Sequence, residues 1–294
     1  MFNFFKKLFS PVIAILDFIT KYFKTVVFLT IMYFVVFDTS SNNISNMQQP
    51  NLQKIELAGP ILDANKVIEQ INKAKKNSNI KGVLFVVNSP GVAVAPSVEI
   101  AYAIKELKEL KPVVAYASGV MASGSYYASI WANEIIANPG SMIGSIGVIL
   151  QGTNVEELMD KIGIETQTVK AGKYKESGTF TRTWTSYEKE ELEKVIDDTY
   201  DIFITDVSNA RGLKKANHEQ YANAHIFTAR QAKEVKLIDE VATLTYAKSK
   251  VIELADVINP VWQKEDKFDK FIDRVINEAS TTIASHLQST LKAY

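Results

Sequence analysis

Two short segments of the chain carry residue types that could do chemistry together. Segment 121–127 (MASGSYY) places serines between small residues at an expected helix start, and segment 171–176 (AGKYKE) offers lysines. Serine is a weak nucleophile at its free pKa and needs a positioned partner to take its proton. The chain has no cysteine, and its 3 histidines, His218, His225 and His286, are not near a glycine-rich turn. A serine hydrolase built from this sequence would therefore use a serine–lysine pair.

Several residues compete for these two roles. They are Ser118, Ser123 and Ser125 for the serine, and Lys170, Lys173 and Lys175 for the lysine. Serine is also a favoured helix cap, and a solvated side chain is the usual state of a lysine. A lysine that acts as a base near neutral pH needs its pKa lowered by about 2–3 units from ~10.4, and burial shifts the pKa in that direction. The residue types alone leave the choice open.

Backbone N–H groups in and near these segments could stabilise an oxyanion. Asn88-Ser-Pro-Gly91 ends a strand expected over Gly82–Val87, and ligands of open α/β sheets bind beyond the carboxyl ends of strands. A glycine turn there can aim N–H groups at a developing negative charge, although a plain strand-to-helix turn has the same composition. Gly124 could supply a second N–H from the start of the next helix. Ser145 could hold the lysine by a hydrogen bond or be an ordinary turn residue.

The elements that would position these residues alternate between strand-like and helix-like patterns. Continuous apolar runs predict strands over Lys54–Leu57, Gly82–Val87 and Pro112–Ala117, and helical spacing predicts helices over Val67–Lys75, Val98–Leu110, Ala122–Trp131 and Thr185–Asn209. Thr185 and Glu188 form a capping box at the start of the last helix. This alternation predicts an α/β fold with a parallel sheet covered on both faces.

The N-terminal part predicts a membrane anchor. The run Val26–Phe37 is apolar except for Thr30, and the lysines before it are Lys6, Lys7, Lys21 and Lys24. A membrane-spanning helix needs ~20 mostly apolar residues, so the run is short and a buried core helix is the alternative. The lysines place the N-terminus in the cytoplasm. We therefore expect an uncleaved signal anchor over 25–38 in the inner (cytoplasmic) membrane, with the rest of the chain outside the cytoplasm.

The remaining boundaries follow from composition. Residues 1–24 form a cytoplasmic or interfacial segment, 39–51 a polar linker, 52–258 the main domain, and 259–294 a C-terminal helix that docks on the domain or on a partner. Lys plus Arg and Asp plus Glu both number 33, so no basic field for nucleic acid exists. The absence of cysteine excludes disulfides and thiolate metal sites. We expect no metal and no cofactor.

Four motifs in order resemble one protein family. They are Asn88-Ser-Pro-Gly91, Ala122-Ser-Gly124 followed by Tyr126-Tyr127, Gly144-Ser-Ile-Gly147, and Gly172-Lys-Tyr-Lys175. Between about Lys54 and Val241 the chain resembles signal peptide peptidase A, a family of membrane-anchored bacterial serine–lysine proteases. The resemblance implies a Clp-protease/crotonase-like α/β fold, Ser123 as nucleophile and Lys175 as base. It also implies an oxyanion site formed by Gly124 with Gly91 and the following residue, here Val92 where the family has glycine.

The resemblance also implies substrates and assembly. The family degrades signal peptides left in the membrane, so the implied substrates are apolar peptides. Single-copy relatives form rings, which implies a homo-oligomer whose serine–lysine dyad is shared between subunits. Two alternatives remain open. One is a catalytically weak scaffold or adaptor of the same fold, which the valine at position 92 suggests, and the other is a crotonase-type acyl-CoA enzyme.

Overall fold

The computed structural model describes residues 18, 20–30, 32–33 and 49–264. The chain divides into two units, Met1–Gln48 and Gln49–Tyr294. The described residues of the first unit are helical and exposed. No helix within the described residues is both long enough and apolar enough to cross a membrane. Parts of the predicted anchor and linker, and residues 265–294 of the predicted C-terminal segment, lie outside the described residues.

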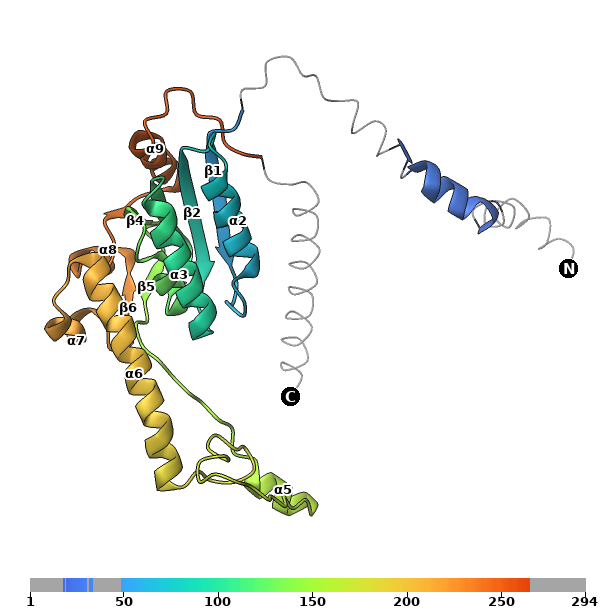
Figure 1. Cartoon of the computed structure of the whole chain (residues 1–294), viewed down its shortest axis with the longest axis vertical. Helices are drawn as coiled ribbons and strands as arrows, with labels where there is room; N and C mark the ends of the chain where they lie inside the picture. Colours follow the sequence, from blue (N-terminus) through green and yellow to red (C-terminus); the bar gives the residue numbers. More distant parts are fainter. Residues whose placement is uncertain (1–17, 19, 31, 34–48, 265–294) are drawn as a thin grey trace, which may run out of the picture. The chain divides into compact units, whose positions relative to one another are not determined.

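Seven strands of the second unit form one mixed sheet (Figure 1). The strands are β1 (Leu52–Ala58), β2 (Gly82–Ser89), β3 (Val113–Ala122), β4 (Glu134–Ala137), β5 (Met142–Gly144), β6 (Ile226–Thr228) and β7 (Glu240–Val241). The main order is β1-β2-β3-β4-β7, and β5 pairs with both β3 and β6. All pairs are parallel except β5 with β6. The sheet therefore brings the carboxyl ends of β2, β3 and β5 to one edge.

Helices cover both faces of the sheet. The described helices of this unit are α2 (Asn65–Lys76), α3 (Val94–Lys108), α4 (Gly124–Ser129), α5 (Glu156–Ile162), α6 (Ser186–Arg211), α7 (His218–Tyr221), α8 (Ala229–Glu234) and α9 (Leu244–Leu254), with a short 3₁₀ turn at Lys215–Asn217. Of these, α5 lies apart from the sheet. Side chains alternate between the faces of a strand. In β2, Phe85 lies in the core shared with α2, α3 and α6, while Leu84 packs against α9 on the opposite face.

The long helix α6 connects the core to a segment that stands apart from the sheet. Near its C-terminal end, Phe203, Ile204 and Val207 are buried in the main core. The N-terminal end of α6 follows residues 149–185, which contain α5. We call these residues the arm. Figure 1 shows the arm beyond the N-terminal end of α6, away from the strands. Within the part of the chain that the structure describes, the arm is thus joined to the sheet through the chain leaving β5 and through α6.

The structure confirms the α/β class and all the strands and helices predicted between Lys54 and Asn209. The differences lie at element ends. Strand β3 continues to Ala122, five residues past its predicted end, because Val120–Ala122 pair with β5. The predicted helix Ala122–Trp131 is shorter and begins at Gly124. Strand β6 joins β5 in an antiparallel pair that the sequence pattern did not predict.

Candidate active site

Ser123 occupies a sharp turn between a strand and a helix. Strand β3 ends at Ala122, α4 begins at Gly124, and Ser123 between them has φ 53° and ψ −126°. This left-handed conformation is uncommon for a residue with a side chain and is typical of functional turns. The backbone is fixed on both sides, since Ser123 N donates to Gly144 O at 2.7 Å and Tyr127 N donates to Ser123 O at 3.0 Å. Within the described residues the Ser123 hydroxyl has no hydrogen-bond partner, and the residue is half-buried.

The neighbouring serines have other surroundings. The Ser125 hydroxyl is buried, donates to Ser89 O at 2.6 Å and accepts from Ala122 N at 2.9 Å, so it ties the turn to β2. The Ser118 hydroxyl lies earlier in β3 and donates to Val87 O at 3.3 Å. Of the three serines that compete in the sequence, Ser123 is therefore the one at the turn with an unpaired hydroxyl.

Gly91 packs directly against the turn that carries Ser123. A Cβ at this position would lie 2.5 Å from Gly124 N and 2.9 Å from Ala122 O, so only glycine fits. Its own N–H donates to the Ser89 hydroxyl at 3.2 Å. The predicted oxyanion residue Gly91 thus shapes the site through close contact, while its N–H is already engaged.

Val92 and Gly124 each present a backbone N–H without a partner among the described residues. Gly124 is the first residue of α4, where the N–H groups of a helix lack internal acceptors. Val92 has φ 133° and a side chain 60% exposed. Its neighbours fix the loop, because Ile61 N donates to Gly91 O at 2.8 Å and Ala93 N donates to Ile61 O at 3.0 Å. Two donors therefore remain available on the elements that flank Ser123.

Ser145 lies beside the same turn on the neighbouring strand. Ala122 pairs with Gly144 in the register of β3 and β5, so Ser145 follows β5 where Ser123 follows β3. Ser145 has φ 51°, and its N–H donates to His225 O at 2.7 Å. The structure thus brings together five of the six residues predicted for the site: Gly91, Val92, Ser123, Gly124 and Ser145.

Lys175 is the predicted site residue that the chain does not bring to Ser123. It is exposed and belongs to the arm, between α5 and α6. The hydrogen bonds and ion pairs described for the arm side chains all remain among residues 154–188. The Lys175 ammonium has no partner among the described residues. By contrast, Lys170 pairs with Glu176, and Lys173 lies over the rings of Tyr174 and Tyr187.

A cluster of four charged residues beside Lys175 was not expected from the sequence. Glu176 accepts from Lys170 and, at 3.1 Å, from Arg182, while Arg182 donates two bonds of 2.9 and 2.8 Å to Glu188. Hydrogen bonds from Lys170, Thr168 and Arg182 lower the pKa of Glu176 to about 2. Hydrogen bonds from Arg182 and Thr185 lower the pKa of Glu188 to about 2. Both carboxylates are therefore ionised near neutral pH. The only sequence signal was the capping role of Glu188.

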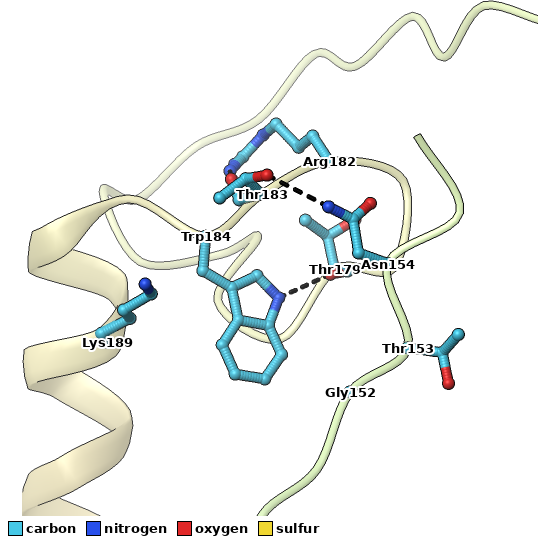
Figure 2. A pocket seen from close by; sticks show the side chains of 8 residues that line it. All are labelled: Gly152, Thr153, Asn154, Thr179, Arg182, Thr183, Trp184 and Lys189. Atoms are coloured by element: carbon cyan, nitrogen blue, oxygen red, sulfur yellow. Dashed lines mark hydrogen bonds between the residues drawn. The ribbon is translucent and has the colours of Figure 1, made fainter. Parts of the chain in front are cut away.

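The arm also encloses a small cavity (Figure 2). Its volume is about 120 Å³, and its lining residues are Gly152, Thr153, Asn154, Thr179, Arg182, Thr183, Trp184 and Lys189. Trp184 Nε1 donates to Thr179 O at 2.6 Å, and Asn154 Nδ2 donates to Thr183 Oγ1 at 3.0 Å, so its polar groups largely satisfy one another. No cluster of metal-binding side chains occurs within the described residues.

A family model and several similar proteins point to one class of hydrolase. The family model described as "Peptidase family S49" matches residues 105–258, which include Ser123, Ser145 and Lys175. A candidate protease of Methanocaldococcus jannaschii is 42% identical over 67% of this chain and 64% of its own length. A candidate signal peptide peptidase SppA of Enterococcus faecium is 29% identical over 70% of this chain and 57% of its own length. The match thus spans less than two thirds of either relative.

One solved structure resembles the chain in part. A point mutant of ClpP1 from Listeria monocytogenes has a TM-score of 0.47 and 17% sequence identity, over 66% of this chain and 93% of that chain.

Proposed function

Because the chain belongs to peptidase family S49, the signal peptide peptidase A family, we propose that it is a serine endopeptidase with Ser123 as its nucleophile. The observation that carries this proposal is the strained turn at Ser123. Among the residues that the structure describes, its hydroxyl and the N–H groups of Val92 and Gly124 have no partner. Family membership favours this function over that of an acyl-CoA enzyme. We further propose a Clp-protease/crotonase-like arrangement of the subunit and apolar peptides, including cleaved signal peptides, as substrates.

The proposed reaction uses a lysine base and a backbone oxyanion site. A neutral Lys175 accepts the Ser123 hydroxyl proton as the serine oxygen attacks the peptide carbonyl. The N–H groups of Gly124 and Val92 stabilise the resulting oxyanion, and Gly91 keeps the two loops close. The protonated lysine then gives its proton to the leaving amine, and a water molecule, deprotonated by the same lysine, hydrolyses the acyl-enzyme. Ser145 is proposed to hold the lysine by a hydrogen bond.

We propose that the lysine comes from a neighbouring subunit. The support is the position of Lys175 on an arm that stands apart from the sheet of its own chain, and that exposes apolar side chains such as Ile149, Ile162 and Phe180. A homo-oligomer, such as a ring, would place the arm of one copy over the β3–α4 turn of the next. The site would then be complete only in the assembly.

The membrane location is also a proposal. The apolar run Val26–Phe37 and the lysines before it support a single anchor over 25–38 in the inner membrane, with the N-terminus in the cytoplasm and the peptidase domain outside. A reporter fused after Tyr294 should therefore be active only if it functions outside the cytoplasm. Activity of a cytoplasm-specific reporter in that position would overturn the orientation.

A serine-directed fluorophosphonate probe tests the proposed function on the full chain in membranes. We expect mass spectrometry to find the label on Ser123, and we expect Ser123→Ala to lose labelling while Ser118→Ala keeps it. Lys175→Arg should be as unreactive as Lys175→Ala, because arginine keeps the charge but does not give up its proton. Labelling of Ser118, or an active Lys175→Arg variant, would refute the assignment. A wild-type chain that does not react would favour the scaffold alternative.

A further inference from the structure

The turn that carries Lys175 is held by a carboxylate one residue away. Lys175 N donates to Gly172 O at 3.3 Å and Thr179 N donates to Glu176 O at 3.0 Å, so residues 172–179 form consecutive tight turns. The backbone of these turns leaves the Lys175 side chain exposed. The adjacent Glu176 is only partly exposed, and its side chain is the first member of the charged cluster described above.

Each charged side chain of the cluster is bound to the next one. Glu176 Oε2 receives Lys170 Nζ and an Arg182 nitrogen, and Arg182 in turn forms a two-bond pair with Glu188. The Glu188 side chain is fully buried and accepts from Thr185 N at 2.9 Å at the start of α6. A planar guanidinium suits this role because it can bind two carboxylates in fixed directions. The Lys175 turn is therefore tied to the first turn of α6.

The location of Glu176 matters because a carboxylate near a lysine favours the protonated amine. Consecutive Cα atoms are about 3.8 Å apart, so Glu176 is the carboxylate nearest to Lys175 along the chain. A protonated lysine cannot act as a base. A free carboxylate at position 176 would thus oppose the chemistry proposed for position 175.

We infer that Lys170 and Arg182 are positioning residues that engage Glu176 and thereby keep Lys175 available as a base. This inference rests on the proposed function, because it assigns a purpose to the neighbours of the proposed base. Together Lys170 and Arg182 satisfy the charge of Glu176 and fix the turn on which Lys175 is presented.

The other charged groups of the arm that have described contacts have partners of their own. Lys173 lies over the rings of Tyr174 and Tyr187, and the α6 residue Lys194 pairs with Glu191. Glu156 on α5 accepts from Thr183. Glu188, the second carboxylate of the cluster, is held by Arg182. Glu176 is therefore the carboxylate whose release would act most directly on Lys175.

The experiment measures the rate of probe labelling at Ser123 against pH in the full-length protein. Lys170→Met removes one partner of Glu176 without exposing the buried Glu188. We expect the pH of half-maximal labelling rate to rise by about one unit, since an opposite charge near an ionisable group shifts its titration by that order. Lys161→Met, which removes an exposed positive charge from α5, is the matched control and should leave the profile unchanged.

A second substitution separates a charge effect from simple loss of structure. Adding Glu176→Gln to Lys170→Met should return the half-maximal pH to that of wild type, because the released carboxylate is gone. A uniform fall in rate at every pH, or a shifted profile that Glu176→Gln does not restore, would overturn the inference. Arg182→Lys, which loses the fork but keeps a positive charge beside Glu176, should shift the profile less than Lys170→Met.

Comparison of Lys175→Ala with Lys170→Met distinguishes a wrong base from a wrong role of the charged cluster. If Lys175→Ala labels at the wild-type rate, the proposed base is wrong and the inference falls with it. If Lys175→Ala is unreactive and Lys170→Met still has the wild-type pH profile, the base stands and only the role of the cluster is refuted.

Discussion

At the scale of single residues, Val92 and Ser123 both adopt conformations that side chains rarely accept. Val92 has φ 133° and Ser123 has φ 53°. A strained residue of this kind costs about 1–3 kcal/mol and persists only where surrounding structure imposes it. At Ser123 the strain accompanies an unpaired hydroxyl. At Val92 the β-branched side chain adds to the cost without adding a donor, because glycine would offer the same N–H.

Val92→Gly should therefore stabilise the protein. The side chain is 60% exposed, so little burial is lost. Relief of about 1–3 kcal/mol of strain exceeds the roughly 0.5–1 kcal/mol that glycine costs through chain entropy. We expect a net gain of about 1 kcal/mol in the free energy of unfolding, measured by urea denaturation, together with faster probe labelling. The control is Val94→Gly, at a neighbouring exposed valine in α3 without positive φ, which should destabilise. Equal destabilisation by both variants would contradict the strain at Val92.

Residue identity alone could not have separated the three serines. The family resemblance points to Ser123. The structure distinguishes it because the hydroxyls of the other two serines bind residues distant in the sequence. The Ser125 hydroxyl is engaged by Ser89 O, which lies 36 residues earlier. The choice of N–H donors for the proposed oxyanion site was also hidden. The N–H of Gly91 is engaged by the Ser89 side chain at the end of β2, while that of Val92 has no partner among the described residues. Such pairings depend on the folded backbone.

At the scale of elements, the sequence predicted those whose own pattern is strong. Strand β2 is a continuous apolar run, and α6 begins with a capping box between Thr185 and Glu188. The sequence did not predict where neighbouring strands extend an element. The second half of β3 contains Ser118 and Gly119, which are poor strand signals, and it is strand because β5 pairs with it. The role of Arg182 was equally hidden, because its partners lie on both sides of it.

The contact between the arm and α6 should weaken in acid. The pKa values of Glu176 and Glu188 are about 2 in the folded protein against an ordinary value of 4.5. Depressed carboxyl pKa values contribute stability that is present above pH ~4.5 and is lost as the pH falls toward ~2. Fluorescence of Trp184 in a Trp131→Phe/Trp262→Phe background should therefore be constant from pH 7 to about 5 and change below about 4. A midpoint above pH 5 would contradict this assignment.

Glu188→Gln is the matched control for the acid transition. It keeps the size of the side chain and removes one of the two titrating carboxylates from the cluster. The fluorescence change of this variant should be smaller, and its arm should already be less well held at pH 7. An unchanged acid transition would show that other carboxyl groups control the arm.

At the scale of the whole molecule, the proposed base lies on the arm at the N-terminal end of the long helix α6, while the proposed nucleophile lies at the edge of the sheet. A helix of 26 residues is about 39 Å long at about 1.5 Å per residue. The buried residues Phe203, Ile204 and Val207 fix one end of α6 in the core, and the charged cluster fixes the Lys175 turn at the other end. This arrangement was beyond sequence reasoning, since the 52 positions between Ser123 and Lys175 (175 − 123) fit either one subunit or two.

Mixed oligomers distinguish these two arrangements. We expect Ser123→Ala chains and Lys175→Ala chains to be inactive alone and to recover activity when co-expressed. If each site draws its serine and its lysine from different subunits, random mixing leaves roughly a quarter of the sites with both residues intact. Labelling of co-purified oligomers should therefore approach a quarter of the wild-type level. A verified mixed oligomer without any labelling would place both residues of the dyad in one subunit.

The separation of the arm from the β3–α4 turn has a consequence for timing. Under the shared-site proposal, a newly made single chain is inactive because its site lacks the lysine of a second copy. No propeptide is required to hold it inactive. The activating event is the meeting of two copies, so in dilute protein the appearance of activity follows second-order kinetics and reverses when the copies separate. Local crowding of the chains then acts as the switch, and proteolysis begins only where enough copies have gathered.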